Sequence, residues 1–466
     1  MHPREATFSF LIFFFFFVLT PSLLTLTFSH QHPNPEHVVK EVLRRVNESV
    51  TTRRSLQSQP PPCPTGNSID DCWRCDPNWG SNRQRLADCG IGFGKYAMGG
   101  KGGEIYMVTD SSDEDPLNPK PGTLRYGVIQ EAPLWIIFQE SMAITLNHEL
   151  LVGKSKTIDG RGVNVQITGK GCIVLRSVTN VIISSLQIYN CVPSKAERVR
   201  LSPDFEEEVS GSDGDGISVQ ASSAVWIDHC TLANCADGLI DVTEGSTAVT
   251  ISNNYFSHHD KVMLLGHSDD YPADKRMQVT VAFNRFGERL GQRMPRCRFG
   301  HFHVFNNDYS AGWGIYAIGG SAQPTINSQN NRFVAPDNPN LKEVTRREES
   351  SQGEWSRWNW RTDGDVFLNG ANFVASGSIQ ADSYTDAESF NPAGFSETLT
   401  QNAGVLNRNQ GNIPIGGGGV STIPGSDQWD IVFTGGAPPQ PPTTVLFWSS
   451  SFLLLVYPTF CSLWGR

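Results

Sequence analysis

The chain has 466 residues, a formal net charge of −10, 18% charged residues and 44 glycines. A weakly charged, glycine-rich composition is more typical of β-proteins than of helical ones. The acidic balance argues against a general nucleic-acid binder, although it leaves room for a local site that binds anions.

The first 29 residues predict a signal peptide. Arg4 precedes the apolar run FSFLIFFFFFVL, and small and polar residues follow towards Ser29. The alternative is a transmembrane anchor, because the apolar character continues into LLTLTF. Asn47 in NES is a glycosylation acceptor, which makes sense only on the secretory route. Residues 30–62 are expected to form an amphipathic helical segment followed by the linker QSQPPPCP.

Six segments of nine residues share one apolar pattern: residues 180–188, 224–232, 248–256, 278–286, 301–309 and 325–333. Their second residue is always apolar and their ninth is apolar or aromatic, which indicates strands with one buried face. Asparagine occupies the seventh position in the last four segments, as Asn254, Asn284, Asn307 and Asn331. Beginning with Leu232, the segment ends lie 24, 30, 23 and 24 residues apart.

A near-fixed period of this length indicates stacked coils, in which like residues of successive coils meet. We therefore predict an all-β fold, a right-handed parallel β-helix over residues 63–405 with long loops on one side. The asparagines would form a ladder of side-chain hydrogen bonds. A β-propeller is the alternative, but its blades need about 40 residues or more. The 44-residue gap between the first two segments is interpreted as about two coils, one of which carries the loop at residues 192–211.

Two acidic motifs lie about one coil apart. Asp213 and Asp215 in SDGDGISV are alternate residues, whose side chains share one face of an extended segment. Asp237 and Asp241 follow in CADGLIDVTEGST, and Asp237 lies 24 residues after Asp213. Either pair alone is more typical of a turn. With coils in register, however, the four carboxylates converge on one outer surface, and this oxygen-rich set predicts a Ca²⁺ site.

A cationic cluster follows one or two coils later. Lys261 lies in HHDKVML, and Arg293, Arg296 and Arg298 lie in GQRMPRCRFGHFH. Arg296 is expected to alternate to the other side of a strand and to be a plain salt-bridge residue. Cations beside calcium carboxylates predict a polyanion that binds both, and a polymer of uronic acid meets this requirement.

The chain has ten cysteines, including the pair in CWRC at residues 72–75. In an exported chain these favour structural disulfides over a redox or metal motif. Removal of Cys461 with a C-terminal propeptide would leave nine cysteines, and hence at least one free, buried thiol.

The C-terminal end is predicted to be processed. Residues 406–437 form a low-complexity, glycine-rich tail that contains NQGNIPIGGGGVSTIPGS. Small residues, a proline-rich spacer and an apolar terminus follow in the order of a glycolipid (GPI) anchor signal, so residues 438–466 would be the propeptide. The alternative is a genuine membrane span.

The motifs together resemble the plant pectate lyases, polysaccharide lyases with a parallel β-helix. The resemblance covers residues 63–376 and rests on DDCWRCDPNW, PGTLRYGVIQ, KTIDGRG, DGDGISV, VWIDHCTL, DGLIDVTEGST, KVMLLGHSD, QRMPRCRFGHFHVFNNDY and YAIGGSAQPTI. The region HQHPNPEHVVKEVLRRVNES and the anchor-like tail resemble a membrane-tied subgroup linked to powdery-mildew susceptibility.

The resemblance implies Ca²⁺-dependent β-elimination of de-esterified homogalacturonan, a (1→4)-α-D-galacturonan. By resemblance, Arg293 is the base that removes the C-5 proton, and Lys261 and Arg298 bind substrate carboxylates. The metal ligands that it implies are Asp213, Asp215, Asp237 and Asp241. It also implies the disulfide Cys72–Cys89, and a second disulfide, Cys191–Cys235, is expected from the adjacent coils.

An arginine base requires surroundings that disfavour its charged form, because free arginine is almost never neutral. The positive charges of Lys261, Arg298 and Ca²⁺ would disfavour the charged form of Arg293. Because a base works best near its own pKa, we expect an alkaline pH optimum. In the rival view Arg293 stays charged and stabilises the carbanion.

Three functions are weighed. The first is an active pectate lyase, secreted to the cell wall or held by a GPI anchor on the outer plasma membrane. The second is a wall protein that binds pectin or signals and turns over slowly. The third is a hydrolase such as a polygalacturonase, which would need paired acids rather than an arginine cluster. A monomer is expected, with homogalacturonan as partner, no nucleic acid, and no membrane contact except through the anchor.

Overall fold

The computed structural model describes residues 63–378, 391 and 393–406. The predicted signal peptide, the helical segment at 30–62 and the anchor propeptide at 438–466 lie outside the described residues. So do Asn47 and the glycine-rich tail beyond residue 406. Within the described part, no helix has the length and apolar character needed to cross a membrane.

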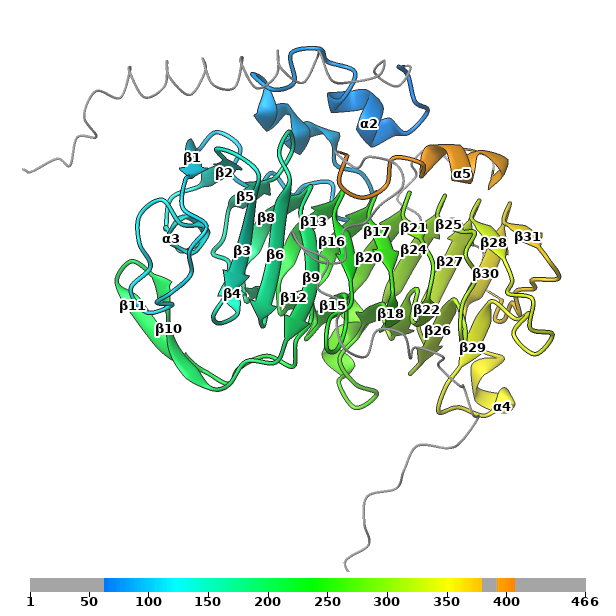
Figure 1. Ribbon diagram of the computed structural model, residues 1–466. Coiled ribbons are helices and arrows are strands. Elements are labelled where there is room, and N and C mark those ends of the chain that lie inside the picture. Colours follow the sequence, from blue (N-terminus) through cyan, green and yellow to red (C-terminus); the bar gives the residue numbers. More distant parts are fainter. Residues whose placement is uncertain (1–62, 379–390, 392, 407–466) are drawn as a thin grey trace, which may run out of the picture. The chain divides into compact units, whose positions relative to one another are not determined.

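Three long sheets of parallel strands form the body of the protein (Figure 1). The ten-stranded sheet contains, in spatial order, β1 (Glu104–Val108), β2 (Leu134–Phe138), β5 (Lys156–Asp159), β8 (Thr179–Ser184), β13 (Ser223–Asp228), β16 (Thr247–Ser252), β20 (Gln278–Ala282), β24 (His301–Phe305), β27 (Thr325–Gln329) and β30 (Trp360–Asp363). From β2 to β29, each coil contributes one strand to each sheet in turn, so the predicted parallel β-helix is confirmed.

The other two sheets have the same stacking order. The nine-stranded sheet contains β3 (Met142–Leu146), β6 (Val165–Lys170), β9 (Gln187–Val192), β14 (Thr231–Ala233), β17 (Tyr255–Ser257), β21 (Arg285–Phe286), β25 (Asp308–Tyr309), β28 (Arg332–Val334) and β31 (Val366–Leu368). The eight-stranded sheet contains β4 (Leu150–Leu151), β7 (Ile173–Arg176), β12 (Ile217–Gln220), β15 (Ile240–Thr243), β19 (Met263–Leu265), β23 (Arg296–Arg298), β26 (Ile318–Ser321) and β29 (Thr345–Arg347).

Short elements lie outside these sheets. The strands are β10 (Glu197–Ser202) with β11 (Phe205–Val209), and β18 (His259–Lys261) with β22 (Leu290–Gln292). The helices are α2 (Ser68–Trp73), η1 (Arg83–Cys89), α3 (Leu124–Val128), η2 (Pro272–Arg276), α4 (Gln352–Trp355), η4 (Ala393–Phe395) and α5 (Ser396–Leu399).

The register agrees with the repeat seen in the sequence. The second residues of the six segments pair from coil to coil, as Val181, Val225, Val249, Val279, Phe302 and Ile326. Each segment bends at its sixth residue, which has a positive φ in all six cases: Ser185, His229, Asn253, Phe283, Asn306 and Asn330. Each segment therefore supplies one strand to the ten-stranded sheet and the next strand to the nine-stranded sheet.

The asparagine ladder is confirmed. Side-chain amide groups donate to the next side-chain oxygen from Asn254 to Asn284 at 3.1 Å, from Asn284 to Asn307 at 3.0 Å and from Asn307 to Asn331 at 2.9 Å. The same oxygens accept backbone N–H groups at the bend, for example from Asn284 to Asn307 at 2.9 Å. The ladder thereby pairs polar groups that the bend would otherwise leave buried and unpaired.

The interior of the coils holds one continuous apolar core. Its aromatic stack runs through Phe256, Phe286, Tyr309 and Phe333, with ring centroids 5.3, 4.4 and 4.5 Å apart. Trp226 is also buried, but it lies on the outer side of the ten-stranded sheet, beneath the N-terminal segment.

The prediction that the 44-residue gap spans about two coils is wrong. Val181 of β8 pairs directly with Val225 of β13, so one coil contains the whole gap. The extra residues leave the coil and fold on themselves as the antiparallel hairpin β10–β11. Val199 and Val209 of this hairpin pack on the outer side of the eight-stranded sheet, which explains why the excursion is ordered without forming a coil of its own.

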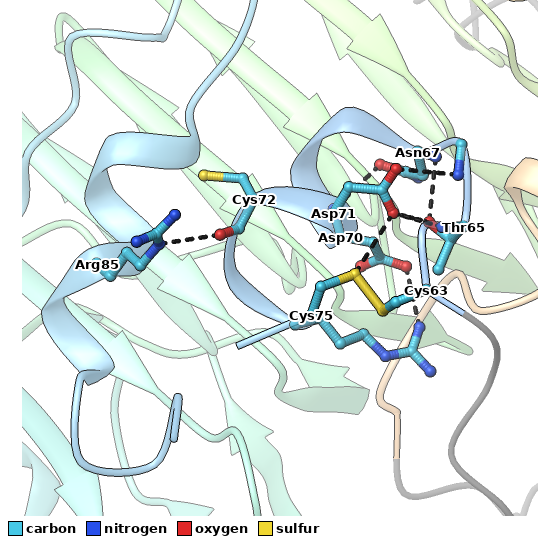
Figure 2. The surroundings of a disulfide bond; sticks show 10 residues. Cys63, Thr65, Asn67, Asp70, Asp71, Cys72, Cys75 and Arg85 are labelled. Atoms are coloured by element: carbon cyan, nitrogen blue, oxygen red, sulfur yellow. Dashed lines mark hydrogen bonds and ion pairs between the residues drawn. A yellow bond between two sulfur atoms is a disulfide. The ribbon is translucent and has the colours of Figure 1, made fainter. Parts of the chain in front are cut away.

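Two disulfides hold the N-terminal segment that contains α2 and η1. Cys72 bonds with Cys89, as predicted. Cys63 bonds with Cys75, as Figure 2 shows. The two cysteines of CWRC thus have different partners. Asn67 caps α2 by accepting the N–H groups of the first turn.

The predicted disulfide Cys191–Cys235 is wrong, because Cys191 bonds with Cys172. Cys191 pairs with Gly169 at the corner of the preceding coil, where the Gly171 N–H donates to the Val192 carbonyl. This corner brings Cys172 to Cys191 within the same pair of coils. Among the described cysteines, Cys230, Cys235 and Cys297 are free thiols, and Cys230 and Cys297 are buried.

Candidate active site

The predicted site residues lie on and beside the outer face of the eight-stranded sheet. On β23 the Cys297 side chain points into the core, and Arg296 and Arg298 therefore both point outward. The expectation that Arg296 alternates to the other side of the strand is wrong, because residues two apart on a strand share a face. It does form a salt bridge, with Arg296 Nη1 2.8 Å from Glu348 Oε2.

Three of the predicted metal ligands form one cluster. Carboxylate oxygens of Asp213, Asp215 and Asp237 all lie within 4.8 Å of one another. Asp213 and Asp215 precede β12, and Asp237 precedes β15, the next strand of the sheet. Parallel pairing in register therefore brings motifs from two coils to the same place.

Hydrogen bonds fix Asp215 within this cluster. Its Oδ1 accepts the N–H of Gly238 at 2.7 Å, and its Oδ2 accepts the hydroxyl of Ser218. Burial, followed by the charge of Asp213, raises the pKa of Asp215 to about 6. Burial and the charge of Asp237 also raise the pKa of Asp213. The carboxylates repel one another, and a bound cation would relieve this repulsion.

Asp241 adjoins the same cluster from the outward face of β15. It is 8% exposed and accepts the Leu264 N–H at 3.3 Å. A Cβ atom at Gly238 would contact carboxylate oxygens of both Asp241 and Asp215, which shows how closely the two approach. Burial and the charge of Asp215 raise the pKa of Asp241 well above its ordinary value.

Lys261 lies directly against the acidic cluster. Its Nζ forms an ion pair with Asp237 Oδ1 across adjacent coils. Lys261 is the last residue of β18, whose first residue, His259, places Nε2 2.5 Å from the Asp237 carbonyl oxygen. The strand thus holds one cation beside one of the predicted metal ligands.

Arg298 is also paired within the chain. Its Nε donates to Asp269 Oδ1 at 2.7 Å, and its Nη1 donates to the Gly266 carbonyl at 3.0 Å. Asp269 lies in the loop after β19, next to β23 in the sheet.

Arg293 differs from the other three cations. It occupies the turn between β22 and β23 with φ of 62°, and its carbonyl accepts the Met263 N–H at 2.7 Å. The side chain is half-buried, and its Nε has no hydrogen-bond partner among the described residues. Of Lys261, Arg293, Arg296 and Arg298, it alone forms no ion pair within the described part of the chain.

Sequence reasoning missed three side chains that shape this site. Ser218 lies three residues after its partner Asp215, and this odd separation is not one that strand alternation links. Asp269 belongs to the quoted motif KVMLLGHSD, but its partner Arg298 lies 29 residues later. Glu348 comes from the loop after β29, and nothing in the sequence links it to Arg296.

Comparison with known proteins places the chain in a family. A family model described as pectate lyase matches residues 144–405. "Probable pectate lyase 12" of Arabidopsis thaliana is 55% identical over 407 residues, which cover 85% of this chain and 84% of that protein. "Pectate lyase" of Zinnia elegans is 55% identical over 387 residues, which cover 83% of this chain and 95% of that protein.

Solved structures agree with the fold. The crystal structure of Jun a 1, the major allergen from cedar pollen, has a TM-score of 0.71 and 50% identity, and the match covers 73% of this chain and 99% of that chain. A thermostable pectate lyase, PL 47, has a TM-score of 0.52 at 20% identity, and at that identity the likeness concerns the fold alone. The family model and the closely similar curated proteins together establish that the chain belongs to the pectate lyase family.

Proposed function

We propose that the protein cleaves de-esterified homogalacturonan by Ca²⁺-dependent β-elimination, with Arg293 as the base. The observation that carries this proposal is the contrast between Arg293 and its neighbours. Lys261, Arg296 and Arg298 each have a carboxylate partner, whereas Arg293 has none among the described residues. Of the four side chains, Arg293 is therefore the one whose charged form is not stabilised by an ion pair within the described residues, as a base requires.

The acidic cluster fits a calcium ion. Its donors are carboxylate oxygens only, which are the hard ligands that Ca²⁺ prefers over softer metals. Asp213, Asp215 and Asp237 would hold the ion, and Asp241 would stand beside them. A bound calcium ion would supply positive charge beside the uronate carboxylate and would thereby make the neighbouring C-5 proton more acidic.

The residues of the chain then have separate tasks. Lys261 and Arg298 orient uronate carboxylates along the outer face of the sheet. Arg293 in its neutral form accepts the proton from C-5, and the electron pair of that bond forms the C-4=C-5 double bond. The C-4 glycosidic oxygen leaves with the electron pair of its bond to C-4 and takes a proton from solvent. The products are an unsaturated uronide and a new reducing end, and no water is consumed.

The second candidate is a pectin-binding wall protein with slow turnover. The ion pairs favour it, because Lys261 and Arg298 must share their charge with Asp237 and Asp269. Such sharing loosens the positioning of a substrate carboxylate, which would slow turnover, and it leaves the binding face in place.

The test uses the full-length protein purified from a secreting host. Polygalacturonate is incubated with Ca²⁺ or with a chelator, and the ultraviolet absorbance of unsaturated uronide is followed. Arg293→Ala is compared with Arg289→Ala, a matched removal of an exposed arginine four residues upstream. We expect absorbance that needs both Ca²⁺ and Arg293 but not Arg289.

Other outcomes decide between the remaining functions. Polymer binding by folded protein without unsaturated product would support the pectin-binding candidate. New reducing ends without ultraviolet absorbance would indicate hydrolysis and would exclude elimination. Loss of activity in Arg289→Ala as large as in Arg293→Ala would remove the special role of Arg293.

We also propose that the protein is secreted to the cell wall and held there by a GPI anchor, as a monomer. The three disulfides among the described residues suit an oxidising, extracellular compartment. Release from the surface of plant cells by a phosphatidylinositol-specific phospholipase would support the anchor. Retention after that treatment would contradict it, and size-exclusion chromatography of the released protein tests the monomer.

A further inference from the structure

The guanidinium of Arg298 has most of its hydrogen-bonding capacity occupied by the chain itself. Nε donates to Asp269 Oδ1 at 2.7 Å, while Nη1 donates to the carbonyls of Gly266 at 3.0 Å and His267 at 3.3 Å. Nη2 donates no hydrogen bond to any of the described residues. Arg298 therefore offers an incoming carboxyl group one nitrogen rather than the two-nitrogen fork that arginine can present.

The fold holds Asp269 in place. The hydroxyl of Ser321, which is fully buried on β26, donates to Asp269 Oδ1 at 2.6 Å. The loop that carries Asp269 is fixed in turn, because Asp274 Oδ2 accepts the His267 N–H at 2.6 Å. Burial would raise the pKa of Asp269, but Ser321 and Arg298 hold it below its ordinary value, so the carboxylate is charged at neutral pH.

The close approach of the loop to β23 is also specified by the sequence. Gly266 has φ of 118°, and a Cβ atom there would lie 2.5 Å from the Cβ of Arg298. Only glycine suits this position, since other residues would clash and would also resist the backbone conformation. The pairing of Asp269 with Arg298 is thus a built feature rather than a chance contact of two surface side chains.

The charges at this point of the binding face therefore cancel. Asp269 neutralises Arg298, and Glu348 similarly neutralises Arg296 on the same strand. A uronate at Arg298 would meet a neutral pair with one free donor. A methyl ester would bind there almost as well as a carboxylate, because its carbonyl oxygen can still accept the single hydrogen bond from Nη2.

We propose that Asp269 is a specificity-determining residue, which makes the subsite at Arg298 accept methyl-esterified galacturonate as well as galacturonate. This inference rests on the proposed function, since it names the substrate that the same site prefers. The protein would then act on partially esterified pectin and not only on the fully de-esterified polymer.

The test compares Asp269→Asn with Asp270→Asn in the full-length protein. Both variants remove one negative charge, but only Asp269 contacts Arg298, and asparagine can still accept the Nε hydrogen bond. The quantity measured is the ratio of kcat/KM on partially methyl-esterified pectin to kcat/KM on polygalacturonate. We expect Asp269→Asn to lower this ratio about threefold, the size typical of a partly exposed ion pair, and Asp270→Asn to leave it unchanged.

Two results would contradict this role of Asp269. An unchanged ratio in Asp269→Asn, or an equal fall in both variants, would overturn the proposal. An equal loss of kcat/KM on both polymers would show that Asp269 only positions Arg298. If the asparagine variant does not fold, Asp269→Ser removes the same charge with a small polar side chain.

A binding measurement separates this inference from the lyase proposal. The dissociation constants of the two polymers are measured by calorimetry for the wild type and both variants, with no need for turnover. If the wild type forms no unsaturated product, the lyase proposal fails, but the ratio of dissociation constants still decides whether Asp269 sets ester tolerance.

Discussion

The carboxylate of Asp365 stands at the end of the asparagine ladder. Its Oδ1 accepts the backbone N–H of Asn331 at 2.7 Å and the side-chain amide of Asn331 at 3.1 Å. Its Oδ2 accepts the hydroxyls of Ser328 and Thr362, each at 2.6 Å. A charged group thus occupies the position that asparagine fills in the four preceding coils.

Replacing this carboxylate with an amide should stabilise the protein at neutral and alkaline pH. Burial raises the pKa of Asp365 to about 6. A raised pKa means that its contribution to stability is full below about pH 4 and is lost as the pH rises through about 6. Asp365→Asn should therefore raise the free energy of unfolding by about 2 kcal/mol at pH 8 and by little at pH 4.

Chemical denaturation at the two pH values measures this difference. Asp363→Asn is the matched control, because it removes the same charge from an exposed residue two positions earlier. The prediction fails if Asp365→Asn destabilises the protein at pH 8, or if both variants change stability equally.

The middle of the ladder should be far less tolerant of substitution. Asn307 donates to the Val281 carbonyl at 2.8 Å and to Asn331 at 2.9 Å, and it accepts two N–H groups from Asn284 at 2.9 and 3.0 Å. Asn307→Ala leaves these buried partners unsatisfied, each at a cost of about 1–3 kcal/mol.

We expect Asn307→Ala to lower the free energy of unfolding by at least about 3 kcal/mol, measured by urea denaturation. Asn338→Ala, at an exposed position in the loop after β28, should change it by less than about 0.5 kcal/mol. A loss below 1 kcal/mol in Asn307→Ala would mean that the ladder contributes little to stability.

The ladder and the coil register could be predicted because both depend on local patterns. Alternation within nine residues identifies a strand, and a near-constant spacing places like residues on successive coils. The same logic predicts from the sequence that Asp213 and Asp237 lie together. Their spacing of 24 residues equals one coil, and their oxygens do meet.

The remaining features depend on contacts that spacing does not encode. A 44-residue gap fits two coils as well as one coil with a hairpin, and only the pairing of Val181 with Val225 distinguishes them. The partner of Arg298 lies in a loop whose path is set by Gly266 and Asp274. The repeat does not indicate Cys172 as the partner of Cys191, because the corner that joins them is not part of it.

A buried histidine should make attachment of the N-terminal segment sensitive to alkaline pH. His229, at the bend after β13, lies 2.6 Å from Asp228 Oδ2 through Nδ1 and 3.1 Å from Asp70 Oδ1 of α2 through Nε2. Burial would lower the pKa of His229, but Asp228 and Asp70 raise it to about 9. Arg74 is the other charged group paired with Asp70.

The raised pKa of His229 determines how the stability of this attachment depends on pH. The stabilisation is full below about pH 6.5 and is lost as the pH rises through about 9. Burial would also raise the pKa of Asp70, but His229 and Arg74 hold it below its ordinary value, so this carboxylate stays charged at neutral pH. Limited proteolysis near residues 63–90 should therefore accelerate between pH 7 and pH 10.

His229→Gln should destabilise the protein by about 3–5 kcal/mol at pH 7, because two buried carboxylates lose their shared cation. It should also abolish the pH dependence of proteolysis. His267→Gln, at an exposed histidine, is the control and should change neither quantity. Equal pH dependence in the wild type and His229→Gln would assign the effect to another group.

The acidic cluster should lose its cation affinity when a single methyl group is added beside it. A Cβ atom at Gly238 would lie 3.0 Å from Asp215 Oδ1 and would overlap Asp241 Oδ1, so Gly238→Ala must displace two carboxylates. Gly353→Ala adds the same methyl group on α4, where nothing lies within 4 Å. We expect Gly238→Ala to weaken Ca²⁺ binding at least tenfold in calorimetry, since the affinity of such sites depends on how many charged ligands meet. Gly353→Ala should bind as the wild type does. Equal affinity in all three proteins would place the calcium site away from these carboxylates. The added methyl group must move Asp215 and Asp241, so a site built on them could not bind calcium unchanged.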